Sequence, residues 1–394
     1  MSSILVSSGT LLDNGLDIQN ISHNTHVQAF SQDFRDAFTC HLYMLYSVMF
    51  FVESESKVGK SIGNLVAPKS KSKKKSDIKK EKERKAETEK TAASREECAL
   101  TMLLAAQTMG KYKSKLWVRG VPDEDMAGLP CRIAYQMLEG ATGVVARKTS
   151  FADASMGIIT TTINHFHCLI GTVVAALLDL LHSYEHIAAL VAELCCMNSE
   201  ESTNNFAIEL LKEIGHLEPE HSAGVEAGVM KASGVKNIAP FLNELAERKP
   251  SLVLENINLV LHHLNSEPYY LRSAIITTIG HVIHRRNEKE ENEQICSDEE
   301  QWGEEKKKSQ KLLKIKESLF DILTERVHDS SSYTRATVLK TWATLGKSQS
   351  IPLQRIISVT SLAIDRLQDK TVVVRKSAMQ VRFLNMIIYQ KIPY

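Results

Sequence analysis

Three stretches of the chain share one pattern: LNSEPYYLRSA (residues 264–274), VHDSSSYTRAT (327–337) and LQDKTVVVRKS (367–377). In each, an aliphatic residue stands eight positions before an arginine, and polar turn residues lie between them. The second and third arginines are 40 residues apart, and the 63 residues between the first and second become 40 once an acidic insertion of 23 residues, 287–309, is removed. This period is typical of HEAT and armadillo repeats. The arginines are Arg272, Arg335 and Arg375.

The residues around these arginines have the periodicity of buried helices. Apolar side chains recur at spacings of one, three and four after the first arginine (Ile275, Ile276, Ile279, Val282, Ile283) and after the second (Val338, Leu339, Trp342, Leu345). Two further apolar-periodic segments, 238–247 and 252–264, are separated at Pro250, because proline lacks the backbone donor that a helix needs. The sequence therefore predicts an all-α fold, a HEAT-repeat α-solenoid built of helix-turn-helix units of about 40 residues, over 235–380.

Each arginine is predicted to lie near the start of the second helix of its unit, as a structural repeat position rather than a binding residue. We expect the guanidinium groups to pair with helix ends, or with acids such as Asp329 and Asp369 within their own turns. The acidic insertion, 287–309, is expected to loop out from the stacked helices.

Two long segments in this region, 236–283 and 319–378, closely resemble the condensin complex subunit 1 family. Weaker similarity extends back through LLDLLHSYEHIAALVAEL (177–194) and FAIELLKEIGH (206–216) to THVQAFSQDFRDAF (25–38). Family members are several times longer, and the match ends near Met379. We therefore expect the chain to be an N-terminal part or a truncated form of such a protein.

The resemblance implies a non-catalytic scaffold, the HEAT-repeat regulatory non-SMC component of condensin I, without a cofactor, metal or catalytic residue of its own. Such a protein would bind the kleisin and SMC subunits of condensin and chromosomal DNA in chromatin, and would support mitotic chromosome condensation. ATP hydrolysis would stay with the SMC subunits. The expected location is the nucleus and chromosomes, with a cytoplasmic pool.

Breaks in composition divide the chain into five segments. They are an N-terminal helical segment (1–54), a basic low-complexity linker (55–92), a helical region of the condensin subunit 1 N-terminal type (93–214), the HEAT-repeat region with its acidic insertion (235–380), and an atypical apolar tail (381–394).

A lysine run within the linker is the most suggestive surface feature. Seven lysines stand there against one acid, Asp77, and no aromatic residue lies among them that could stack on bases. Three interpretations are open: a solvated linker, a nuclear import signal, or a segment that contacts DNA phosphates. The lysines are Lys69, Lys71, Lys73, Lys74, Lys75, Lys79 and Lys80.

Two enzyme motifs compete with the scaffold interpretation. His182, Glu185 and His186 fit the HxxEH pattern of zinc metallopeptidases, but two histidines in an apolar helical stripe lack a third ligand. Gly59-Lys60-Ser61 imitates the end of a P-loop, yet Ser54 stands where the first glycine is needed. We therefore predict that the chain is not an enzyme. The alternatives are another HEAT scaffold (cohesin-associated, transport receptor or phosphatase scaffold) and, less favoured, the metallopeptidase.

Composition is that of a soluble intracellular protein. The chain has 43% hydrophobic and 24% charged residues and a net charge of +1, which does not point to a particular class of partner. Its seven cysteines have no regular spacing and are predicted to be reduced thiols. The start lacks a basic signal sequence, and the longest apolar runs are too short for membrane spans. No membrane and no small-molecule substrate are expected.

Overall fold

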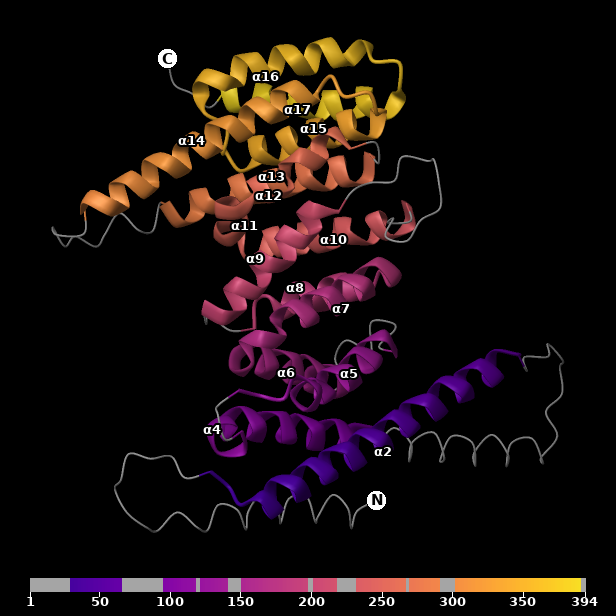
Figure 1. The fold of residues 1–394 in the computed structure, drawn as a ribbon. Coiled ribbons are helices and arrows are strands. Elements are labelled where there is room, and N and C mark those ends of the chain that lie inside the picture. The colour runs from indigo at the N-terminus through magenta and orange to yellow at the C-terminus, as the bar shows by residue number, and fades with distance from the viewer. Residues whose placement is uncertain are drawn as a thin grey trace. The chain divides into compact units, whose positions relative to one another are not determined.

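The computed structural model describes residues 29–65, 95–117, 121–140, 150–197, 201–217, 232–266, 269–290 and 302–390. Within these residues every regular element is a helix and none is a strand, which confirms the all-α prediction (Figure 1). The chain divides into two compact units, Met1–Leu180 and Leu181–Tyr394.

The first unit is built from helices that follow one another closely. They are α2 (Gln32–Leu65), a helix over 95–111, α4 (Lys113–Leu116), α5 (Glu124–Gly140), α6 (Ser150–His165), the 3-10 helix η2 (His167–Leu169), and most of α7 (Ile170–Ser183). α2 packs against α5, and α5 packs against α6. The buried side chains of α2 recur every three or four residues, as expected for one face of an amphipathic helix (Phe38, Leu42, Leu45, Met49, Val52).

A buried ion pair joins the two sides of the predicted linker. Arg95 donates from Nε and Nη2 to the two carboxylate oxygens of Glu53, both at 2.6 Å. The guanidinium also lies 4.2 Å from the ring centroid of Phe151 on α6. α2 continues to Leu65, past the residue at which we expected the linker to begin, and the rest of that linker lies outside the described residues.

Helix length and hydropathy also bear on membrane insertion. No single helix in the described part of the chain has the length and apolar composition to cross a bilayer, although α6 and α7 together would meet those criteria, with a bend of 113° between them.

The second unit continues with helices up to the end of the described chain. They are α8 (Ile187–Leu194), α9 (Glu201–His216), α10 (Ala232–Arg248), α11 (Pro250–Asn256), α12 (Asn258–Leu261), η3 (His262–Asn265), α13 (Tyr269–Glu290), α14 (Trp302–Arg326), α15 (Ser332–Lys347), α16 (Leu353–Asp365), η4 (Arg366–Gln368) and α17 (Val372–Gln390).

One row of helices forms the spine of this unit. α10 packs against α13, α13 against α15, and α15 against α17, while α14 contacts α15 and α16 contacts α17 (Figure 1). Between α14 and α15 the rings of Phe320 and Trp342 stack with centroids 5.7 Å apart, and both side chains are fully buried. Each helix therefore buries its apolar face against its neighbours, as in a HEAT-repeat stack.

The described ends of the acidic insertion are helical, and our expectation that the insertion loops out from the stacked helices stays a prediction. α13 continues through 287–290, and α14 begins at Trp302, within the insertion. The reason is local: the Glu- and Lys-rich ends have high helix propensity and allow favourable pairs three or four residues apart. Residues 291–301 lie outside the described chain.

Gly215 marks a close approach of two helices in the second unit. A Cβ added there would collide with the backbone oxygen of Leu259 on α12, which cannot rotate away. We expect Gly215→Ala to lower the free energy of unfolding by about 1–3 kcal/mol, because α9 must shift. Urea denaturation followed by circular dichroism measures this. Gly171→Ala is the control, since a Cβ there meets nothing within 4 Å, and it should leave stability unchanged or slightly raised. Equal effects of the two substitutions would contradict the close approach.

Candidate functional site

The three repeat arginines occupy the same position in their helices. Each is the fourth residue, in α13, α15 and α17 respectively. Each guanidinium donates from Nη1 to the backbone carbonyl six residues earlier, from Arg272 to Ser266, from Arg335 to Asp329 at 2.8 Å, and from Arg375 to Asp369 at 2.8 Å. The arginine thus closes the turn that precedes its own helix.

The same guanidinium groups also reach the following turn. Arg272 donates from Nε and Nη2 to Asp329 at 3.1 and 3.0 Å, and Arg335 donates in the same way to Asp369 at 2.9 and 3.0 Å. Both carboxylates are nearly inaccessible, with side-chain exposures of 3%. We call these two contacts the arginine–aspartate ladder. Two-point pairing of this kind fixes orientation as well as distance.

The ladder corrects one prediction. We expected the acid partners to lie within each arginine's own turn, but the own-turn contacts go to backbone carbonyls and the carboxylate comes from the next unit. The partners are 57 residues apart in the first pair and 34 in the second. The difference of 23 equals the length of the acidic insertion, which supports the repeat register proposed from sequence.

The ladder sets the protonation of Asp369. Hydrogen bonds from Arg335 hold the pKa of this carboxyl well below its usual range, and bonds from the backbone and hydroxyl of Thr371 act in the same direction against the opposing effect of burial. The group is therefore a carboxylate throughout the physiological pH range. It acts as a fixed charge and not as an acid or base.

A second set of contacts runs in the reverse direction along the same turns. Arg326 donates to Asn265 of the preceding turn at 2.7 Å, and Arg366 donates to Nδ1 of His328 at 2.9 Å. Asn265, Arg326 and His328 line a polar pocket of about 370 Å³, which Arg272 and Asp329 also line. Its charged groups are used in holding neighbouring turns together, so we assign this pocket a structural role.

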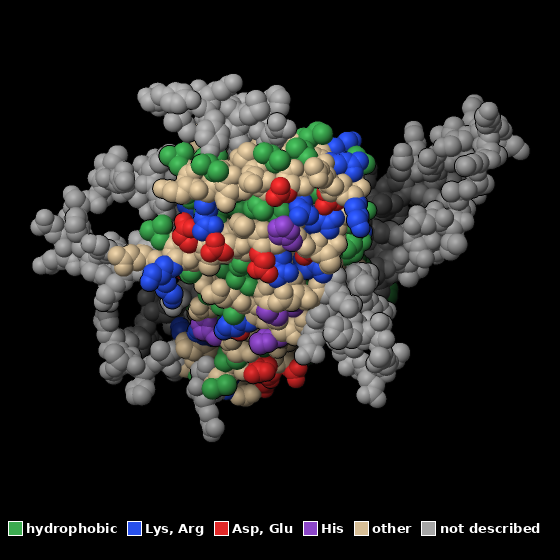
Figure 2. Space-filling model, turned by 90° about the horizontal axis from the view of Figure 1, so that it is seen from above, with side chains coloured by type: hydrophobic (Ala, Val, Ile, Leu, Met, Phe, Trp, Pro, Cys, Tyr) green, Lys and Arg blue, Asp and Glu red, His purple; other side chains and the backbone are tan. Residues whose placement is uncertain are grey.

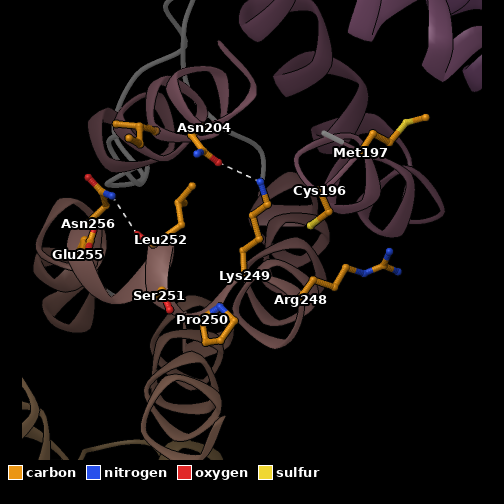
Figure 3. A pocket seen from close by; sticks show the side chains of 11 residues that line it. Cys196, Met197, Asn204, Arg248, Lys249, Pro250, Ser251, Leu252, Glu255 and Asn256 are labelled. Carbon is orange, nitrogen blue, oxygen red and sulfur yellow. Dashed lines mark hydrogen bonds between the residues drawn. The ribbon is translucent and has the colours of Figure 1, made fainter. Parts of the chain in front are cut away.

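A larger pocket, of about 670 Å³, lies between α9, the turn after α8 and the junction of α10 with α11 (Figure 3). We call it the Lys249 pocket. Lys249 points across it and donates from Nζ to Oδ1 of Asn204 at 2.9 Å. Arg248 extends away from Lys249, and it pairs with Glu244 and Glu193. Sequence reasoning missed this pocket, because Lys249 and Asn204 are far apart in sequence and Pro250 indicated only a helix break.

The sequence-predicted lysine run lies outside the described residues. On the face shown in Figure 2, the described Lys and Arg side chains are mixed with acidic and histidine side chains. The DNA-contact and import-signal interpretations of the run therefore stay predictions.

The HxxEH motif does not lie on one helix. His182 is in the last turn of α7, His186 is the residue before α8, and the chain turns between them. The pattern needs both imidazoles on one helical face, so this geometry does not fit the metallopeptidase alternative. In the described ranges, no group of three or more His, Cys, Asp or Glu side chains is arranged to hold a metal ion.

The adjacent thiols of Cys195 and Cys196 are also poor nucleophile candidates. Burial raises the pKa of both thiols, and the Cys195 side chain is fully buried. A reactive cysteine needs a lowered pKa and access to solvent.

Comparisons with known proteins bear on the family. Residues 5–172 match the family model described as non-SMC mitotic condensation complex subunit 1, N-term. The chain is 30% identical over 263 residues to condensin-1 complex subunit CAP-D2 of Arabidopsis thaliana, which covers 66% of this chain and 17% of that protein. It is 27% identical over 268 residues to condensin complex subunit 1 of Xenopus laevis (68% and 18%) and 25% identical over 267 residues to that of Homo sapiens (68% and 17%).

The chain thus spans less than a fifth of the length of each of these relatives. The family model covers the region in which the resemblance appeared weaker from sequence, ahead of the arginine repeats. Residues 5–172 are thus similar to the N-terminal domain of the non-SMC mitotic condensation complex subunit 1 family, and about two thirds of the chain is similar to proteins named as condensin subunits.

Proposed function

We propose that this chain is a non-catalytic HEAT-repeat scaffold of the condensin complex, which binds the kleisin and SMC subunits and chromosomal DNA during mitotic chromosome condensation. The observation that carries the proposal is the family match over residues 5–172 together with relatives that are named condensin subunits. Its place of action would be the nucleus and chromosomes, with a cytoplasmic pool.

The architecture of the second unit supports a scaffold. Its charged groups at the inter-helix turns are paired with one another in the arginine–aspartate ladder and in the reverse contacts. Such pairing fixes neighbouring units in one register and leaves the exposed faces of the helices for partners.

Co-purification tests the assignment directly. The tagged chain, expressed with the condensin kleisin and the SMC pair, should retain the kleisin through size-exclusion chromatography. A matched sample with a phosphatase catalytic subunit or a cohesin kleisin should show no co-elution. Co-elution with one of these and not with the condensin kleisin would replace the proposal with another HEAT scaffold.

The lysine run provides a separate prediction. If its lysines contact phosphates, their replacement with Gln should weaken DNA binding, and each lost contact should reduce the slope of log affinity against log salt by about 0.7–0.9. Fluorescence anisotropy at several salt concentrations measures this slope. If the run is an import signal, DNA affinity should stay unchanged and the protein should remain cytoplasmic in interphase cells. The residues replaced are Lys69, Lys71, Lys73, Lys74, Lys75, Lys79 and Lys80.

The control replaces the lysine triplet Lys306, Lys307 and Lys308 with Gln. This change also removes positive charge, but from the acidic insertion. If both variants lower DNA affinity in proportion to the charge removed, binding depends on net charge and the run has no special role. If neither affinity nor location changes, the run is a solvated linker.

A further inference from the structure

The Lys249 pocket contains a positive charge without a paired negative charge. The Lys249 side chain is half-buried, and its ammonium donates to a neutral amide oxygen of Asn204. No carboxylate in the described chain pairs with this ammonium within 4.0 Å. The neighbouring Arg248, by contrast, is neutralised by Glu244 and Glu193. A carboxylate that enters the pocket would form a charge-assisted hydrogen bond with this partly desolvated ammonium, which is stronger than the bond to a neutral amide.

The other walls of the pocket are partly apolar and partly polar, and Glu255 lines it on the side of Asn256, away from Lys249 (Figure 3). Met197, Ile208, Pro250 and Leu252 line it beside the ammonium, and Met197 is 41% exposed. A volume of about 670 Å³ is sufficient for an acidic side chain together with a neighbouring aliphatic one. An inorganic anion would pair with the ammonium of Lys249 and leave the apolar side chains exposed to water. A peptide segment can pair with the ammonium and also bury those side chains.

We propose that the Lys249 pocket binds a segment of a partner protein in which a Glu or Asp stands beside an aliphatic residue. The carboxylate accepts hydrogen bonds from Nζ of Lys249, and the aliphatic side chain packs on Ile208 and Leu252. DNA is the less suitable ligand, since Arg248 is already paired and a single lysine does not form a track for a phosphate backbone. This binding site does not depend on the proposed place of the chain in condensin.

The experiment measures binding of short fluorescein-labelled peptides to the whole chain by fluorescence anisotropy. The probe alternates Glu and Leu, and its matched control alternates Gln and Leu. We expect the Glu peptide to bind saturably and the Gln peptide to bind at least about tenfold more weakly, because the charged hydrogen bond is lost. The same loss is expected for the Glu peptide with the Lys249→Met variant, which keeps the aliphatic stem.

Three further variants separate binding from folding. Asn204→Asp introduces a carboxylate beside Nζ and should abolish peptide binding as fully as Lys249→Met, although the lysine is still present. Lys249→Arg keeps the charge and should retain most of the affinity. Lys212→Met removes a lysine that pairs with Glu209 and does not line the pocket, and it should have no effect. Thermal unfolding followed by circular dichroism checks that each variant is folded.

Several outcomes would overturn the proposal. They are the absence of saturable binding by the Glu peptide, equal affinity for the Gln peptide, or unchanged binding in folded Lys249→Met or Asn204→Asp protein. Displacement of the peptide by a double-stranded oligonucleotide, in a manner that depends on Lys249, would identify a phosphate site and would equally reject it.

Discussion

Replacement of Asp369 with alanine is expected to lower the free energy of unfolding by about 3–5 kcal/mol, one of the two largest single effects that this structure predicts. The substitution leaves the guanidinium of Arg335 in its partly buried position without a carboxylate. It also removes the acceptor for the backbone N–H of Thr371, which opens the turn before α17. Urea denaturation followed by circular dichroism measures the change in midpoint and slope.

A double-substitution cycle separates the pair from its surroundings. Arg335→Ala should also be strongly destabilising, and the double variant should lose less than the sum of the two single losses, because the second change removes a group that is already unpaired. The control is Asp321→Ala, which breaks an exposed contact with Arg355 at 2.8 Å and should cost no more than about 1 kcal/mol. If Asp369→Ala is as mild as Asp321→Ala, the ladder does not stabilise the stack.

Acid gives an independent test of the same contact. The folded-state pKa of Asp369 lies well below the value of about 3.9 for an unfolded aspartate, so its stabilising effect is complete above that value and is lost as the pH falls through the folded pKa. The stability difference between the wild-type protein and Asp369→Ala should therefore stay constant from about pH 7 to pH 5 and shrink below about pH 4. A difference that persists undiminished into acid would show that charge pairing is not its origin.

Replacement of Trp342 with alanine is the second large effect, with an expected loss of about 3–5 kcal/mol. Its indole is 1% exposed and stacks on Phe320, so truncation leaves a cavity between α14 and α15 that packed helices cannot fully close. The same denaturation measurement applies.

Phenylalanine at this position is the informative comparison. The indole Nε1 is buried without a hydrogen-bond partner, so Trp342→Phe removes an unsatisfied donor as well as volume. We expect Trp342→Phe to cost less than half as much as Trp342→Ala. If Trp342→Phe and Trp342→Ala lower the free energy of unfolding equally, an aromatic ring at this position does not stabilise the fold through its packing on Phe320.

The sequence predicted those features that depend on local pattern. Apolar spacing after Arg272 and Arg335 predicted helices, and the shared offset predicted equivalent positions for these two and Arg375, which all three occupy as fourth residues. A helix can be predicted from sequence because its buried positions recur every three or four residues within one continuous segment.

The contacts between units could not be predicted in the same way. Asp329 precedes Arg335 by six residues and follows Arg272 by 57, and a periodic sequence contains both pairings. The structure contains the pairing of Asp329 with Arg272. Nη1 of Arg335 instead donates to backbone carbonyls of its own turn, and only the three-dimensional direction of each guanidinium decides between the two pairings. The pairing of Lys249 with Asn204 brings together residues 45 apart that belong to no repeat, so no periodic pattern indicated it.

The arginine–aspartate ladder also has a practical use in labelling. Arg272 and Asp329 meet in the same geometry as Arg335 and Asp369, although 23 more residues separate them. The packing of the helices therefore does not depend on the number of residues between α13 and α14. Each doubling of a flexible connection costs only about 0.6 kcal/mol in closure entropy. A fluorescent protein or an affinity tag inserted between α13 and α14 would therefore report on the position of the protein in a cell while both termini stay native.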